Sequence, residues 1–261
     1  MRQSSTADDT GYRRTDAAPG GMVEHHSRQG CVLSSQRCPR ARVVALQSAA
    51  AERFYPPQRC CTMDRIDARD SILVVIDMQE RLFPRVHRWE RVRERLLFTI
   101  RGSKIFNIPI IITEQNPNGL GATVPEVEAA LPIYSPEVKM SFCAFDCPTF
   151  EERVIGSGRR TLIVIGIETH ICILQTVMEA LSRGFRVYVV AVATSSTDLE
   201  DHEVALDRMA RLGAVITTSQ SLLYELMGSA DDERFRDLLD LVKSSRRKMP
   251  ALYAFESSGE R

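Results

Sequence analysis

Short apolar runs alternate with amphipathic stretches along the chain from about residue 71. In Ser71-Ile72-Leu73-Val74-Val75-Ile76-Asp77 a continuous apolar run ends in a carboxylate, as expected of a parallel strand buried on both faces. Similar runs predict further strands at 109–113, near 138–139, and at 161–165, 186–191 and 214–217. Apolar residues at helical spacing predict helices at 88–106, 149–156, 169–183, 201–212, 219–227 and 232–242. This alternation predicts an α/β fold with a parallel sheet and helices on both of its faces.

Residues 1–62 have a different character. They are rich in Ser, Arg, Gly and Pro, contain no Lys, and show no sustained helical or strand period. We therefore expect a disordered or targeting extension at 1–62, a folded domain at 63–245 and a flexible tail at 246–261. Met63 is an alternative start to Met1. Acidic residues in the extension disfavour a transit segment, so we expect a cytoplasmic protein, with a mitochondrial destination as the alternative.

Composition narrows the classes of partner. Lys and Arg together number 34, as do Asp and Glu, so the net charge is zero and offers nucleic acid no overall basic field. No apolar run approaches the roughly 20 residues of a membrane span. The seven cysteines follow no secretory signal, and the Cys143–Cys147 pair has no second Cys or His pair nearby to complete a zinc site. Reduced thiols are expected.

Three residues at predicted strand ends carry the candidate chemistry. In a parallel sheet covered by helices, the functional crevice lies outside the carboxyl ends of the strands. Asp77 and Lys139 each end a strand, and Cys172 lies in the first turn of a helix, where N–H groups and the helix dipole stabilise a thiolate. Taken singly, these residues also suit a packing thiol, a helix cap and a surface lysine. Together at one edge they form a nucleophile, a base and a charge partner.

Three motifs stand in order on these elements. They are Val75-Ile76-Asp77-Met78-Gln79, Val138-Lys139, and Gly166-Ile167-Glu168-Thr169-His170-Ile171-Cys172 with Gln175-Thr176 following. In these motifs residues of about 70–245 resemble the isochorismatase-like cysteine hydrolases, which include nicotinamidases and N-carbamoylsarcosine amidohydrolases. The resemblance implies a Rossmann-like three-layer sandwich whose six-stranded parallel sheet has the order 3-2-1-4-5-6. It also implies an Asp-Lys-Cys triad at Asp77, Lys139 and Cys172, a cis peptide at Ile167–Glu168, and an oxyanion hole formed by the N–H groups of Glu168 and Cys172.

The chain departs from parts of that family. Nicotinamidases hold a metal with an Asp and two His after the second strand, whereas here Glu114-Gln115-Asn116-Pro117-Asn118-Gly119 contains no His. We therefore expect no metal and no other cofactor. True isochorismatases lack the nucleophilic cysteine, so Cys172 favours acyl transfer. The stretch 114–124 is most similar to eukaryotic isochorismatase-domain-containing proteins, for which the resemblance implies no particular substrate.

Further polar and aromatic residues lie near the predicted strand ends. We expect four to line the substrate pocket: Gln79, Phe83, Gln115 and Thr169. His170 lies two residues before Cys172 on a helix start, so its side chain should point to a different face. Polar residues after the fifth strand have no His in a serine-triad motif and are expected to be cap and loop residues: Ser195, Ser196 and Asp198.

The sequence therefore predicts a cofactor-independent hydrolase that acts on a small amide or related acyl substrate through a covalent thioester. A small-molecule substrate and further copies of the chain are the expected partners, whereas a membrane is not expected and nucleic acid is disfavoured. Two alternatives stay open. One is a non-catalytic binding or scaffold protein that retains the fold, and the other is a nucleic-acid-associated role through the basic extension, for which no platform of stacking aromatic residues is found.

Overall fold

The structure, a computed structural model, describes residues 65–248. The expected extension at 1–62, and the compartment that depends on it, therefore lie outside the described residues and stay predictions. Residues 249–261 of the expected tail lie outside them as well. No helix among residues 65–248 is long and apolar enough to cross a membrane.

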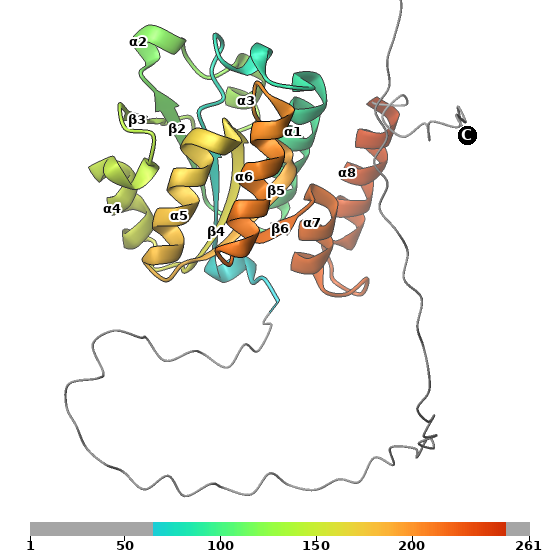
Figure 1. The fold of residues 1–261 in the computed structure, drawn as a ribbon. Helices are drawn as coiled ribbons and strands as arrows, with labels where there is room; N and C mark the ends of the chain where they lie inside the picture. Colours follow the sequence, from blue (N-terminus) through green and yellow to red (C-terminus); the bar gives the residue numbers. More distant parts are fainter. Residues whose placement is uncertain (1–64, 249–261) are drawn as a thin grey trace, which may run out of the picture. The chain divides into compact units, whose positions relative to one another are not determined.

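Six strands form one parallel sheet (Figure 1). The strands are β1 (Ser71–Ile76), β2 (Ile110–Gln115), β3 (Glu137–Lys139), β4 (Thr161–Ile167), β5 (Arg186–Ser195) and β6 (Val215–Thr217). Their order in the sheet is β3-β2-β1-β4-β5-β6. The expected α/β fold and the strand order 3-2-1-4-5-6 are confirmed. Because the order reverses between β1 and β4, the crevice of the sheet lies at the carboxyl ends of these two strands.

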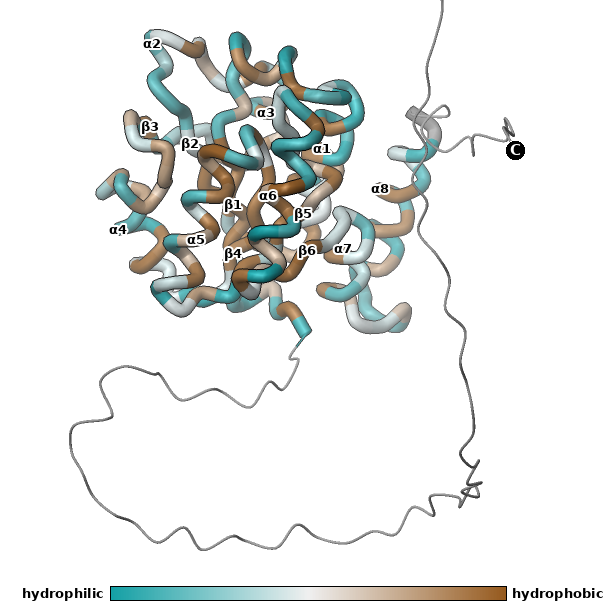
Figure 2. Tube along the Cα trace, in the orientation of Figure 1, coloured by the Kyte–Doolittle hydropathy of each residue, from teal (hydrophilic) through white to brown (hydrophobic). Residues whose placement is uncertain are grey.

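Helices cover both faces of the sheet. One core contains Leu73 and Val75 of β1 with α1 (Trp89–Ile105), α7 (Ser219–Met227) and α8 (Phe235–Lys248). The opposite core contains Ile72 and Val74 with α4 (Pro148–Gly156) and α5 (Leu174–Ser182), and Met209 of α6 (Leu199–Arg211) belongs to it. Side chains alternate between faces along a strand, so β1 contributes to both cores and every one of its residues is buried. Figure 2 shows this apolar centre as brown tube between more hydrophilic outer helices.

Several boundaries differ from the sequence-based expectation. The stretch 116–136, expected to be a loop, contains the short helices α2 (Pro117–Leu120) and α3 (Pro125–Glu128), each with Pro near its first turn. Strand β5 continues to Ser195 instead of ending near residue 191. The last helix begins at Phe235 and runs to Lys248, past the expected domain end at residue 245. The basic run that ends at Lys248 therefore belongs to this helix.

Gly166 allows β4 to approach β1 closely at the carboxyl end of the sheet. Its φ is +120°, a backbone conformation that residues with a side chain rarely adopt. A Cβ at this position would lie 2.1 Å from the carbonyl oxygen of Ile76, the residue with which Gly166 is paired. A side chain here would therefore push apart the two strands that precede Asp77 and Cys172.

We expect Gly166→Ala to destabilise the domain by roughly 2–5 kcal/mol, because it adds both backbone strain and a clash with the main chain of β1. Gly158→Ala is the matched control, since Gly158 also has a positive φ, +69°, but has no atom within 4 Å of the added Cβ. The control should lose only about 1–2 kcal/mol. Urea unfolding followed by circular dichroism measures both, and equal losses would contradict the close approach of the strands.

Candidate functional site

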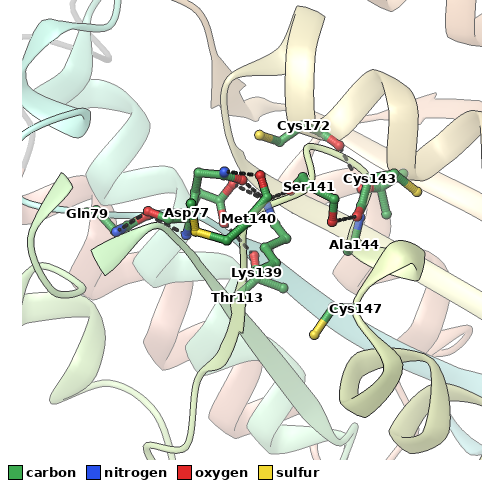
Figure 3. A network of polar contacts seen from close by, with 12 residues as sticks. Asp77, Gln79, Thr113, Lys139, Met140, Ser141, Cys143, Ala144, Cys147 and Cys172 are labelled. Atoms are coloured by element: carbon green, nitrogen blue, oxygen red, sulfur yellow. Dashed lines mark hydrogen bonds and ion pairs between the residues drawn. The ribbon is translucent and has the colours of Figure 1, made fainter. Parts of the chain in front are cut away.

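The candidate site is built on a buried ion pair at the carboxyl edge of the sheet. Asp77 directly follows β1, and Lys139 is the last residue of β3. Lys139 Nζ lies 2.7 Å from Asp77 Oδ2, and both side chains are 0% exposed. Figure 3 shows the two side chains pointing toward each other from strands on either side of β2. Two charges so completely removed from water are stable only when their remaining hydrogen bonds are also satisfied.

Neighbouring polar groups satisfy the ion pair. Thr113 of β2 donates from Oγ1 to Asp77 Oδ1 at 2.7 Å, so both carboxylate oxygens have a partner. Lys139 Nζ donates to Gln115 Oε1 at 2.8 Å and to the carbonyl oxygen of Ser141 at 3.4 Å. The three ammonium donors therefore have three acceptors. Asp77 itself has a φ of 51°, a left-handed conformation that Asp tolerates better than most residues.

Cys172 lies beside this pair on a π-helical turn, Thr169–Ile173, that precedes α5. The expected α-helix over 169–183 therefore begins as a wider turn, in which the N–H of Ile173 donates to the carbonyl of Glu168. The peptide bond between Ile167 and Glu168 is cis, at the position where the resemblance places it. Thr176 Oγ1 donates to the carbonyl of Cys172 at 2.7 Å and accepts the N–H of Ala144 at 3.0 Å, which ties the turn to the segment after β3.

The start of the turn was expected to stabilise a thiolate at Cys172, but its surroundings act against the charged form. The residue is only 5% exposed, and burial followed by the Asp77 charge raises the pKa of its thiol to about 12, although Lys139 acts in the opposite direction. Desolvation disfavours the charged form more than the start of the turn favours it. Cys172 is therefore a neutral thiol near pH 7, and it lies next to a carboxylate that can accept its proton.

The four residues expected to line the pocket are all buried. Gln79 donates from Nε2 to the carbonyls of Gln115 and Gly121, at 3.0 and 2.7 Å, and its Oε1 accepts the N–H of Gln115 at 2.8 Å. No N–H of this amide is left for a substrate. Phe83 lies in the core with its ring edge-on to Trp89, at a centroid distance of 5.9 Å. These contacts place Gln79 and Phe83 in the framework of the site, and direct contact of either residue with a substrate stays a prediction.

Gln115 and Thr169 also have internal partners. Gln115 holds Lys139 through Oε1 and donates from Nε2 to the carbonyl of Met140 at 2.7 Å. Thr169 Oγ1 is 2.9 Å from His202 Nδ1. Both residues therefore position the triad candidates or the turn that carries Cys172, and direct contact with a substrate stays a prediction.

A polar network that supports the Cys172 turn was missed in the sequence. The Glu168 carboxylate accepts the backbone N–H of Thr197 at 3.2 Å and its hydroxyl at 3.1 Å. His170 Nδ1 lies 2.9 Å from Ser196 Oγ, and Ser196 is fully buried. The polar run at 194–198 is the available signal, because it directly follows β5, but the same residue types are equally typical of helix caps and loops. Among residues 65–248 no group of three or more His, Cys, Asp or Glu is arranged to hold a metal ion.

We expect Cys172 to react with iodoacetamide at pH 7 more slowly than free cysteine, whose thiol pKa is about 8.5. Asp77→Asn should speed this reaction, because it removes a charge that raises the pKa of the thiol. Asp146→Asn is the control, since Asp146 acts in the same way on the pKa of Cys143 and is not among the groups that act on Cys172. Peptide mapping by mass spectrometry across a pH series separates the thiols. Faster alkylation of wild-type Cys172 than of free cysteine would contradict the raised pKa.

Comparison with known proteins assigns the chain to a family. The family model described as the isochorismatase domain matches residues 71–221. Isochorismatase domain-containing protein 1 of Salmo salar is 36% identical over 199 residues, which cover 74% of this chain and 68% of that protein. A structure described as MAR1 ribonuclease from Caenorhabditis elegans is 34% identical, with a TM-score of 0.65 over 69% of this chain and 93% of that one. The YcaC gene product of Escherichia coli, described as an octameric hydrolase of unknown specificity, is 26% identical, with a TM-score of 0.65 over 72% and 96% of the two chains. The chain that places Asp77, Lys139 and Cys172 at one sheet edge therefore belongs to the isochorismatase-domain family.

Proposed function

We propose that this protein is a cofactor-independent cysteine hydrolase that cleaves a small amide or related acyl substrate through a thioester on Cys172. The observation that carries this proposal is the fully buried Asp77–Lys139 ion pair beside the Cys172 thiol. Burying two charges has a high desolvation cost, so a fully buried ion pair beside a nucleophile indicates a functional role. Here the pair can accept the thiol proton and balance the charge that develops. The description of the YcaC relative as a hydrolase agrees with this assignment.

In the first half of the reaction, Sγ of Cys172 attacks the carbonyl carbon while its proton passes to Asp77. Because burial and the Asp77 charge raise the pKa of the Cys172 thiol, little of it is ionised at pH 7, so attack coupled to proton transfer is the effective route. The N–H groups of Glu168 and Cys172 stabilise the oxyanion that forms. When the C–N bond breaks, Asp77 returns the proton to the leaving amine, and a thioester remains on Cys172.

In the second half, water attacks the thioester carbonyl. Asp77 accepts a proton from this water, the C–S bond breaks, and the proton restores the Cys172 thiol as the carboxylic acid leaves. Lys139, at 2.7 Å from Asp77, keeps the positive charge of the site in place while the proton moves. The chain's own residues carry every proton and electron pair, so the proposed mechanism includes no cofactor.

We expect wild-type protein to hydrolyse at least one member of a panel of small amides, ureides and esters, and Cys172→Ala to lose about 10³-fold or more of that rate. Cys143→Ala is the matched control, because Cys143 is also a buried free thiol but is not part of the proposed triad. Intact-mass spectrometry of quenched reactions should show an acyl adduct on wild type alone. Activity that survives in Cys172→Ala contradicts the mechanism, and saturable binding without any turnover would favour the scaffold alternative.

RNA cleavage is a second candidate, favoured by the description of the Caenorhabditis elegans relative as a ribonuclease. The zero net charge and the burial of Cys172 agree less well with a polyanionic substrate. A fluorescently labelled single-stranded RNA is therefore included in the same panel. Cleavage of RNA that persists in Cys172→Ala but not in Asp77→Asn would favour this candidate over acyl transfer.

We also propose that the protein self-associates through the exposed edge of the sheet at β3. Val138, Met140 and Phe142 are 52%, 71% and 51% exposed, whereas Lys139 between them faces the site. Because side chains alternate in direction along this segment, large apolar side chains point toward solvent at an edge of the sheet. Monomeric proteins usually avoid such an exposed apolar edge. The YcaC relative is described as octameric, which supports a second copy of the chain as the occupant.

The double substitution Met140→Glu/Phe142→Glu should convert an oligomer to a smaller species, because it places charges in the contact. Size-exclusion chromatography with light scattering measures the mass. Val204→Glu is the control, since Val204 is equally exposed, at 67%, but lies on α6 away from β3. A monomeric wild type, or an oligomer that the double variant leaves intact, would refute the assignment.

A further inference from the structure

A pocket of about 390 Å³ opens beside β5, and Asp77, Lys139 and Cys172 are not among the residues that line it. Its walls come from the start of α1, the second half of β5 and the start of α6. The residues that matter for its chemistry are His87, Arg88, Arg91, Val192, Leu199 and His202. This volume lies within the range of small-molecule sites, roughly 300–1,000 Å³.

An irregularity of β5 makes room for the pocket. Val164 of β4 pairs with Val189 of β5, and Gly166 of β4 pairs with Thr194 of β5. Between these two pairs β4 advances by two residues and β5 by five. The additional residues of β5 bulge out of the ladder, and β6 pairs only with Tyr188 to Val190. Ala191 and Val192 are therefore partly exposed in the middle of a long strand and line the pocket. Bulges of this kind are frequent next to functional sites.

The lining combines fixed positive charge with an apolar patch. Within residues 65–248 no ion pair or side-chain hydrogen bond engages the guanidinium groups of Arg88 and Arg91, and Glu203 is the one acidic residue of the lining. Nε2 of His87 is buried without a hydrogen-bond partner among the described residues. A buried polar atom of this kind usually has a partner, and His87 Nε2 would gain one if its ring turned toward a ligand in the pocket.

This combination selects the class of ligand. Guanidinium groups bind carboxylates in a bidentate manner, and a nearby imidazole nitrogen adds one hydrogen bond. Val192 and Leu199 offer a surface to a short hydrocarbon body, which inorganic phosphate lacks. Burial lowers the pKa of His202, so this imidazole contributes little positive charge near pH 7, whereas the two arginines are charged.

The pocket is joined to the Cys172 turn by hydrogen bonds. His202 of its wall pairs through Nδ1 with Thr169 Oγ1 at 2.9 Å, and Thr169 begins the π-helical turn that contains Cys172. The backbone N–H of His87 donates to the carbonyl of Ser196 at 2.8 Å, and Ser196 pairs with His170 of the same turn. A ligand that contacts His87 and His202 could therefore shift the residues that orient this turn.

We propose that this pocket binds a small carboxylate with a short apolar body, and that its occupancy changes turnover at Cys172. The binding site stands on the geometry of the pocket alone. The effect on turnover rests on the proposed hydrolase function.

Binding is tested with hexanoate, titrated into the full-length chain by calorimetry. We expect saturable binding that weakens at least tenfold in Arg88→Gln/Arg91→Gln and for the uncharged analogue hexanamide. Arg101→Gln, on the last part of the same helix, should bind as wild type does, and so should Cys172→Ala. The site is overturned if hexanoate does not bind, if the arginine pair makes no difference, or if Cys172→Ala abolishes binding. Equal, arginine-dependent binding of inorganic phosphate would overturn the carboxylate class.

Turnover is tested with any substrate found in the hydrolase panel. Hexanoate should change the rate at least twofold in wild type and leave Arg88→Gln/Arg91→Gln unaffected. Binding without a change in rate overturns the coupling to Cys172. Binding by a protein that hydrolyses nothing supports the pocket and counts against the proposed function alone, so the two failures are distinguishable.

Discussion

The ion pair between Asp77 and Lys139 constrains how the strands on this side of the sheet meet. Both charges are removed from water, which costs several kcal/mol per ion, and only close pairing with full hydrogen bonding offsets such a cost. Thr113 and Gln115, both on β2, complete that bonding from the strand between them. A shift of β2 or β3 by one residue would leave a charge buried without its partner. The geometry of the site therefore depends on the register in which β1, β2 and β3 pair.

The same dry surroundings determine the state of the sulfur. A thiolate would be a third charge in this small volume, so burial and the Asp77 carboxylate keep Cys172 protonated at rest. The oxidisable form of cysteine is the thiolate, and a neutral thiol therefore survives between turnovers better than an ionised one. In the proposed mechanism the sulfur becomes reactive only when a carbonyl carbon and the carboxylate are both in reach.

Much of this arrangement could be predicted from sequence, because parallel strands place their last residues at one edge. That rule, applied to the apolar runs, located Asp77 and Lys139, and the resemblance supplied the strand order. The π-helical turn at 169–173 could not be predicted, since five residues are too few to separate its period from that of an α-helix. The raised pKa of Cys172 could not be predicted, because burial depends on segments distant in sequence. The partners of the Gln79 amide could not be predicted for the same reason, since they lie 36 and 42 residues away.

The side-chain amide of Gln79 joins the site to the end of β2 and the segment after it, and all of its partners there are main-chain atoms. Its amide bonds to the carbonyls of Gln115 and Gly121 and to one backbone N–H, so the attachment does not depend on the side chains between them. Residues 116–120 can therefore change during evolution without loosening Asp77 or Lys139. Different side chains at these positions could alter selectivity beside the site, while the amide of Gln79 keeps the framework in place.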